Sequence, residues 1–413
     1  ASFLRLVGAE MPSNSDLIKW AEQGRLHTNY TNCASAGAAG DDTATITVGD
    51  ALVPGTGSIA IRVGQTVVIS DNAGAGLNKG IVTAVNTGAA TFDVAYYEAA
   101  GQVGAAGLTR TVFIYGSEFK KGTSGMVGSL EADDLILDNK PIIIKDKYEV
   151  SGSDMAQIGW VEVTTENGAT GYLWYLKSEH ETRMRFDDYL ETSMIEAVPA
   201  EAASGALVTA GVDGSDGVFY SVNDRGNVWS GGYPTTLSDW DTIVARLDKQ
   251  GAIEENALFV NRAFGFAIDD MLADQSTTTG ASFGLFDNDK DMALNLGFSG
   301  FRRGYDFYKT DWKYLNDAST RGGVDGISSI EGVLVPAGTS TVYDQILGTN
   351  IRRPFLHVRY RASQSDDRRM KSWLTGSAGG AFTSTLDAME VNFLSERCLV
   401  TQAANNFVLF KGI

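Results

Sequence analysis

Cysteine, histidine and proline are scarce in this chain, and each shortage excludes a class of protein. The 413 residues include only two cysteines, three histidines and seven prolines. Two cysteines in so long a chain, Cys33 and Cys398, predict neither a disulfide framework nor a zinc site, which favours a reducing compartment. His27, His180 and His357 fall in three different segments without paired-His spacing, so we expect no histidine-based metal site.

Positive charge is scarce as well. The chain has 33 Lys and Arg against 51 Asp and Glu, a net charge of −18, which is the wrong sign for a sequence-independent DNA binder. No run of 18 apolar residues predicts a membrane span. The start, ASFLRLVGAEMP, lacks a basic region followed by an apolar core and has no initiator Met, so we expect a processed or trimmed terminus and no intact signal peptide.

Motifs for catalysis and ligand binding are also lacking. No HExxH, GxSxG or GxxxxGK[ST] occurs, and GFSGF around Ser299 is only a near miss for a nucleophile elbow. GTGSIA at Gly55 lacks the third glycine of a dinucleotide fingerprint and predicts a turn entering a strand. DNDKDM begins like a calcium loop at Asp287, but Met292 replaces the glycine and Phe298 the final glutamate, which favours an acidic surface loop. We expect no cofactor and no metal.

The chain is rich in glycine, with 47 residues, and in short β-branched runs. Residues 1–42 are predicted to form an extended N-terminal arm with one short helix over DLIKWAEQG, capped by Ser15, and a small polar linker, NYTNCASAGAAGDD. Residues 43–115 contain runs such as TATITV, SIAIRV and TVVISD. They predict an inserted β-barrel or sandwich of five or six strands.

Residues 116–168 are predicted to form a long hairpin. In PIIIKDKYEV the residues Ile142, Ile144, Tyr148 and Val150 share one face, and GWVEVTT is the expected partner strand. A two-stranded hairpin is marginal alone, so this one needs another surface to lie on.

One long charged helix is predicted within 169–198. From Tyr172 it runs about 27 residues without Pro or Gly, near 40 Å at ~1.5 Å per residue. Its apolar stripe is interrupted by Glu179 and Arg183, which we interpret either as a partly solvated pair or as a contact with a neighbouring subunit.

Residues 199–384 are predicted to be an α/β region. Ser238 and Asp241 resemble a capping box for a helix that Gly251 ends. The strand ALFVN and the helix RAFGFAIDDMLADQ follow, and EGVLVP and PFLHVRYRA are further strands. Residues 385–413 are predicted to be strands that turn at Ser395–Arg397 and return.

Basic residues cluster in only one region of this acidic chain. A solvated face is one interpretation of the cluster, and a docking patch for the acidic surface of an adjacent copy is a second. Nucleic-acid binding is a third, less favoured because no aromatic stacking pattern accompanies the arginines. The candidate subunit-contact residues outside the long helix are Arg352, Arg353, Arg359, Arg361, Arg368 and Arg369.

The order of these parts resembles that of the major capsid protein of tailed bacteriophages, which has the HK-97-type fold. YLKSEHETRMRFDDYLE resembles the spine helix of that family, and the 116–168 hairpin resembles its extended loop. The end of the chain, from RPFLHVRYRASQSDDRRMKSWLTGSAGG to AANNFVLF, is similar to capsid proteins of crAss-like and related marine phages. The β-rich block at 43–115 departs from the simplest members.

The resemblance implies an α+β capsid fold in which 199–384 supply mainly the axial domain and 385–413 close the peripheral and axial core. It implies a structural virion protein, not an enzyme, that assembles in the bacterial cytoplasm into an icosahedral head around double-stranded DNA. The implied partners are copies of itself as hexamers and pentamers, and portal and decoration or auxiliary proteins, with only weak proximity to DNA and no membrane. Some relatives are cross-linked by a Lys–Asn isopeptide bond; Lys145 and Lys147 are available here, but no pair can be assigned.

Two alternatives remain open at this point. One is another β-rich phage structural protein or an encapsulin-type shell. The other, less favoured, is an acidic carbohydrate hydrolase that uses two of the many carboxylates.

Overall fold

The protein is a mixed α and β chain, rich in strands, that divides into two compact units. The computed structural model describes residues 3, 9–23, 29–49, 59–71, 76–102, 109–128, 134–157, 163–164, 170–171, 174–200, 205–278, 299–324, 329–344, 349–378, 380 and 382–412. One unit is Lys19–Leu137, and the other combines Ala1–Ile18 with Asp138–Ile413. In the described residues no helix is both long and apolar enough to cross a membrane.

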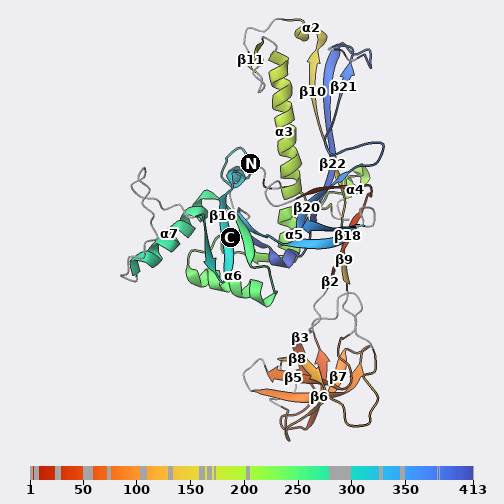
Figure 1. Cartoon of the computed structure of the whole chain (residues 1–413), viewed down its shortest axis with the longest axis vertical. Helices are drawn as coiled ribbons and strands as arrows, with labels where there is room; N and C mark the ends of the chain where they lie inside the picture. The colour runs from red at the N-terminus through yellow and green to blue at the C-terminus, as the bar shows by residue number, and fades with distance from the viewer. Residues whose placement is uncertain are drawn as a thin grey trace. The chain divides into compact units, whose positions relative to one another are not determined.

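The unit Lys19–Leu137 contains a closed six-stranded barrel (Figure 1). Alternate side chains of each strand point inward, where residues such as Ile46, Phe92 and Val94 are almost fully buried. The barrel strands, in spatial order, are β3 (Asn29–Ser35), β4 (Thr43–Val48), β7 (Thr91–Tyr96), β6 (Leu77–Asn86), β5 (Gln65–Asp71) and β8 (Thr109–Ser117). A separate ribbon pairs β2 (Ile18–Gln23) with β9 (Asp134–Asn139).

The other unit contains a sheet that we call the β22 sheet. Its centre is the 14-residue strand β22 (Ala388–Thr401), which pairs on one side with β10 (Ile142–Ser151). On the other side it pairs first with β21 (Lys371–Gly376) and then with β20 (Leu356–Arg361). The strand β1 (Glu10–Ser13) adds to β20 in parallel.

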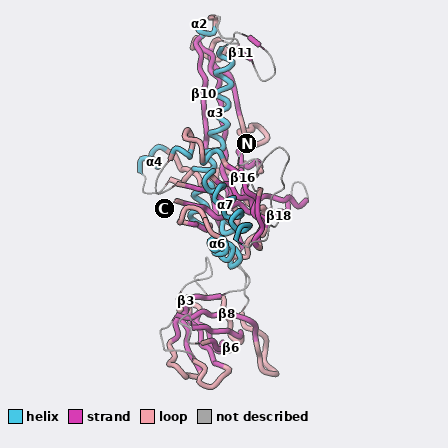
Figure 2. The backbone as a smooth tube through the Cα atoms, turned by 90° about the vertical axis from the view of Figure 1, so that its left-hand side faces the viewer, coloured by secondary structure: helices cyan, strands magenta, loops and turns pink. Residues whose placement is uncertain are grey.

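The helix α3 (Trp174–Glu196) lies along the β22 sheet beside β10 and β22 (Figures 1 and 2). Phe186 and Leu190 pack against Met389, Val391 and Phe393, and the rings of Phe186 and Phe393 stack 5.6 Å apart. The connection from β10 to α3 contains α2 (Gly152–Met155), β11 (Val163–Thr164) and β12 (Thr170–Gly171).

A second sheet of six strands forms a layered body with helices. Alternation along β14 sends Leu258 and Val260 toward α6 and α7, and Phe259 toward α5 and the C-terminal end of α3. In spatial order the strands are β13 (Asn227–Trp229), β23 (Val408–Lys411), β17 (Ile330–Pro336), β14 (Glu255–Val260), β16 (Tyr305–Asp311) and β15 (Gly300–Arg303). The helices are α5 (Val218–Arg225), α6 (Leu237–Lys249) and α7 (Arg262–Thr278).

The remaining elements are short and connect these layers. They are α4 (Gly205–Ala210), the hairpin of β18 (Thr339–Asp344) and β19 (Thr349–Pro354), and the 3₁₀ turns η1 (Lys313–Leu315), η2 (Arg321–Gly323) and η3 (Ala404–Asn406). Since β22 belongs to one sheet and β23 to the other, the end of the chain contributes to both.

Several predicted elements are confirmed. The structure contains the long helix, the strand ALFVN as β14, the helix after it as α7, the strand EGVLVP within β17, and β20. Gly251, with φ +63°, ends α6, because the Gly251 and Ala252 amides bond back to Asp248 and Leu247. The capping box was placed two residues late: Thr236 and Asp239 form it, not Ser238 and Asp241.

The helix predicted after Ser15 is wrong. Residues Ile18–Gln23 form β2, whose side chains alternate between half-buried and exposed. The Ser15 hydroxyl instead bonds locally to the Leu17 backbone. Nine residues are too few for a stable isolated helix, whereas pairing with β9 supplies ladder hydrogen bonds.

The six-stranded barrel contains the predicted strands TATITV and TVVISD as β4 and β5, but two other segments differ from the prediction. The stretch from Asn29, read as a linker, contains β3, while SIAIRV is not a strand. Ile59 and Ile61 are fully buried without strand pairing, and the Ala60 amide donates to the Tyr30 hydroxyl at 2.7 Å.

The predicted hairpin partner and the predicted turn near the C-terminus are also wrong. The strand β10 pairs with β22, nearly 250 residues away, and within the described part of GWVEVTT, Val163–Thr164 pairs with Thr170–Gly171. The polar residues Ser395–Arg397 lie inside β22 without a turn, because buried partners satisfy them, as described next.

Candidate functional site

The predicted basic cluster lies on and beside the β22 sheet. Arg359 and Arg361 are on β20, Arg368 and Arg369 precede β21, and Arg353 is on β19. Arg352 is also on β19, but its side chain lies outside the described residues. The structure therefore brings most of the cluster to one region, and the carboxylates around it divide the arginines into two groups.

Arg361 and Arg368 share one buried carboxylate. Glu396, 7% exposed, lies 3.0 Å from Arg368 and 3.7 Å from Arg361. Arg361 also pairs with Asp16, which holds the pKa of Arg361 above its usual value. These two arginines are thus occupied within their own chain.

Arg369 shares Glu10 of strand β1 with a buried arginine. The Glu10 carboxylate lies 2.5 Å from Arg369 Nε and 3.4 Å from Arg397 Nη1. Arg397 is 5% exposed and also donates to Ser395 Oγ at 3.0 Å and to the Arg369 carbonyl at 3.1 Å. Burial lowers the pKa of Arg397, and Glu10 opposes that effect. The sequence reading missed this network, because a glutamate and an arginine 387 positions apart carry no local pattern.

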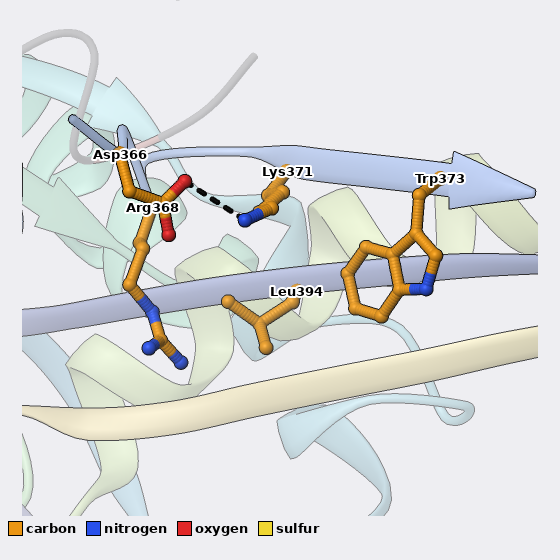
Figure 3. Close-up of a pocket in the computed structure, with 5 residues that line it drawn as sticks. All are labelled: Asp366, Arg368, Lys371, Trp373 and Leu394. Carbon is orange, nitrogen blue, oxygen red and sulfur yellow. Dashed lines mark hydrogen bonds and ion pairs between the residues drawn. The ribbon is translucent and has the colours of Figure 1, made fainter.

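A shallow hollow of about 340 Å³ lies beside these groups (Figure 3). Its floor is Leu394 of β22, which lies between Arg368 and Trp373. Lys371 bonds to Asp366 at 2.8 Å across its rim. Trp373 is 38% exposed, so an aromatic wall and a charged rim face solvent together.

Arg353, Arg359 and His357 form the second group, and within the part of the chain that is described no carboxylate pairs with them. His357 is 1% exposed, and its Nδ1 donates to the Pro354 carbonyl at 2.9 Å. Burial, with a smaller contribution from Arg359 and Arg353, lowers the pKa of His357 to about 4. Burial and then Arg353 also lower the pKa of Arg359.

On α3 the structure changes the interpretation of Glu179 and Arg183. Thr182 takes the buried position between the apolar residues, Glu179 is half-buried and Arg183 is exposed. Within the described residues, no ion pair joins Glu179 to Arg183. Two other pairs form on this helix. Glu181 pairs with Lys177 at 3.4 Å, and Arg185 bonds twice to Asp146 of β10, at 2.9 and 3.0 Å.

The two lysines of β10 are on the exposed side of that strand. Lys147 bonds to Glu149 at 2.8 Å and to Glu390 at 3.1 Å, and these carboxylates raise its pKa. Its amine is therefore held protonated and is a poor nucleophile in this arrangement. Lys145 is exposed.

Other residues considered from the sequence stay apart. His180 is exposed on α3, whereas His27, Gly55 and the Asp287–Met292 loop lie outside the described residues. In the part of the chain that is described, no group of three or more His, Cys, Asp or Glu side chains could hold a metal ion. Cys33 and Cys398 are both buried, and neither forms a disulfide with the other.

Comparisons with known proteins give structural similarities without sequence matches. No family model matches the chain, and no curated protein matches its sequence. The chain is similar to a structure from Microbacterium phage Oxtober96, at 10% identity and a TM-score of 0.39, over 100% of this chain and 91% of that one. It is similar to the asymmetric unit of the bacteriophage PhiM1 mature capsid, at 11% identity and a TM-score of 0.36, over 72% and 78%.

A further similarity is to the cryo-EM structure of the holo-SrpI encapsulin complex from Synechococcus elongatus PCC 7942. The identity is 11% and the TM-score 0.36, over 68% of this chain and 77% of that one. At TM-scores this low, the similarities do not decide the function of this chain.

Proposed function

We propose that the chain is a structural shell subunit of the HK-97 type, the major capsid protein of a tailed phage. The observation that carries the proposal is the arm in which α3 lies along β10, β21 and β22. The arm is one helix on one sheet, and it leaves large apolar side chains in solvent. Those between 38% and 53% exposed on α3, β10 and β21 are Leu176, Met184, Tyr189, Ile143, Trp373 and Leu374.

Open strand edges support the same proposal. In the described residues, β10 and β21 each pair with β22 alone, so each has one edge without a neighbouring strand. Unpaired edges and exposed apolar groups are costly in a monomer and favourable in a lattice. A subunit of this design gains stability by mass action when copies assemble, and closed symmetry limits the assembly to a shell.

The order of elements also fits the family resemblance. An N-terminal strand, a long strand leading into α3, a layered α/β body and a last pair of strands shared between two sheets follow one another along the chain. The barrel would be an insertion that braces neighbours or decorates the shell surface. The net charge of −18 would keep an inner wall from binding packaged DNA tightly.

Electron microscopy of purified protein tests the proposal directly. Closed shells, or hexamers and pentamers, are the expected particles. A protein that stays monomeric at high concentration under every assembly condition would overturn it. Neighbouring terminase and portal genes separate a phage capsid from an encapsulin, for which an enzyme cargo gene is expected.

The long helix offers a second test, through Glu179→Ala combined with Arg183→Ala. If these residues contact a neighbouring subunit, as we propose, assembly falls while the thermal stability of the unassembled subunit changes little. The pair Lys177→Ala and Glu181→Ala on the same helix is the matched control. Equal loss of subunit stability and assembly would contradict a contact role for Glu179 and Arg183.

A further inference from the structure

Three cationic or basic side chains gather at one place where the described residues supply no paired carboxylate. His357 and Arg359 are two residues apart on β20 and so share a face of the sheet. Arg359 lies opposite Cys398 in register, and His357 lies opposite Val400. Arg353, at the end of β19, completes the group, since its positive charge lowers the pKa of both His357 and Arg359.

Buried nitrogen atoms in this group lack hydrogen-bond partners. The Nε atoms of Arg353 and Arg359 and the Nε2 atom of His357 are buried, and none of them has a partner in the described residues. Because His357 Nδ1 donates to a carbonyl, Nε2 of the neutral ring is an acceptor without a donor. A buried polar atom without a partner costs free energy, and a carboxylate that bonds the half-buried guanidinium groups of Arg353 and Arg359 would offset part of that cost.

The charged groups around the cluster do not neutralise it. Cys398 is buried, which raises the pKa of its thiol to about 12 and keeps it uncharged. The charge of Asp216 contributes to the raised pKa of Cys398. Burial raises the pKa of Asp216 itself, and the neighbouring Arg225 lowers it. By contrast, Arg361, Arg368 and Arg369 each have a carboxylate of their own chain within 4 Å.

We infer that Arg353, Arg359 and His357 form an acceptor site for one carboxylate side chain of a second copy of this chain. The inference rests on the proposed function, since it requires that copies assemble. Complementary charge supports it: the chain carries 51 acidic residues against 33 basic ones, so any second copy presents mainly carboxylates. Arginine is also the side chain best suited to a half-buried carboxylate, because its fork bonds both oxygens.

A nucleic-acid phosphate fits the same site less well. The site is small and half-buried, whereas a polyanion would also have to approach a chain with a net charge of −18. One protruding Asp or Glu side chain brings a single negative charge and little bulk. Its negative charge would also favour protonation of the buried His357 ring beside the two arginines.

The first test replaces both arginines, Arg353→Gln and Arg359→Gln, in the full chain. Arg302→Gln, an exposed arginine paired with Asp306, is the matched control. Analytical ultracentrifugation should show that the double variant needs about tenfold more protein to assemble, while the control assembles as wild type does. Thermal unfolding of the unassembled double variant should occur at the wild-type temperature or above, since two unpaired, half-buried charges are removed. Unchanged assembly, or an equal loss of subunit stability, would overturn the inference.

The second test identifies the partner group. Arg353→Lys keeps the charge and introduces an amine that carbodiimide can join to a carboxylate in contact with it. Shells assembled from mixed ¹⁴N and ¹⁵N subunits should yield cross-linked peptides that carry both labels. Cross-links within one subunit only, or loss of DNA retention with normal assembly, would overturn the inference. If wild-type protein forms no particles at all, the proposed function itself fails, which is a distinguishable result.

Discussion

The barrel and the β22 sheet differ in their strand edges and in how far their buried groups reach for partners. The six barrel strands close on themselves, and buried Tyr30 and Gln102 find partners inside the same unit. The β22 sheet has open edges, apolar groups in solvent and buried arginines whose carboxylates come from distant segments or are missing. A closed barrel can fold alone, whereas the β22 sheet has the features of a surface that other copies complete.

The largest expected effect tests the independence of the barrel. Phe92 is 1% exposed in the barrel core, so Phe92→Ala should destabilise the barrel by about 3–5 kcal/mol. Hydrogen exchange should show lost protection in β3 to β8 and unchanged protection in β10, β22 and α3. Equal loss of protection in both units would contradict separate cores.

A pH effect of on the order of 3 kcal/mol is expected from the β22 sheet. The pKa of His357 falls from 6.5 to about 4 in the folded subunit, because burial disfavours the charged ring and Arg353 and Arg359 repel it. Between these values the unfolded chain binds more protons. The contribution of His357 to the free energy of unfolding is therefore most favourable above pH 6.5, and it is lost as the pH falls toward 4.

Urea unfolding of unassembled subunits at pH 7 and pH 5 measures this dependence. The variant His357→Gln should show a smaller loss of stability between the two pH values than wild type. An identical loss in both proteins would show that His357 is not the titrating group.

A smaller effect is expected where the N-terminal strand meets the β22 sheet. Glu10→Gln removes the carboxylate beside buried Arg397 and should cost about 1–3 kcal/mol. Asp16→Asn is the control: Asp16 is 88% exposed and its partner Arg361 keeps Glu396, so the loss should stay below about 0.5 kcal/mol. Chemical denaturation measures both variants, and similar losses would contradict the role given to burial.

The smallest effect is expected on the solvent side of α3. Lys177 and Glu181 are both about 60% exposed, so Lys177→Ala should cost only about 0.2–0.5 kcal/mol. Arg185→Ala should cost more, because its partner Asp146 is only 14% exposed and accepts two bonds. Thermal melts of the two variants measure both losses of stability. A larger loss for Lys177→Ala than for Arg185→Ala would contradict the expected order.

Local patterns in the sequence predicted several elements well. The absence of Pro and Gly identified α3, period-2 alternation identified β10, a short apolar run identified β14, and Gly251 marked the end of α6. Each of these depends on neighbouring residues in the chain, since propensity, periodicity and capping act over one or two turns. The same reasoning misread Ile18–Gln23 and Ser395–Arg397, where tertiary partners override local preference.

The candidate site was only partly predictable. The cluster of arginines is visible in the sequence, but its division is not. Glu396 and Glu10 pair with Arg361, Arg368 and Arg369, whereas the described residues give Arg353 and Arg359 no paired carboxylate. Arg183 was placed in the apolar stripe of the helix, yet Thr182 is the residue that packs inward. One residue is a rotation of 100° around a helix, which composition cannot resolve.

By itself, the sequence determined the scarcity of cysteine and histidine, the acidic charge, the glycine-rich β block and the long helix. These are properties of composition and of local periodicity, which do not depend on the fold. The tertiary structure alone decided that β10 pairs with β22 and that β3 closes the barrel. It also decided which arginines have a carboxylate partner among the described residues. The physical reason is that strand pairing and ion pairing join groups far apart in the chain, and burial, not spacing, sets which of those contacts form.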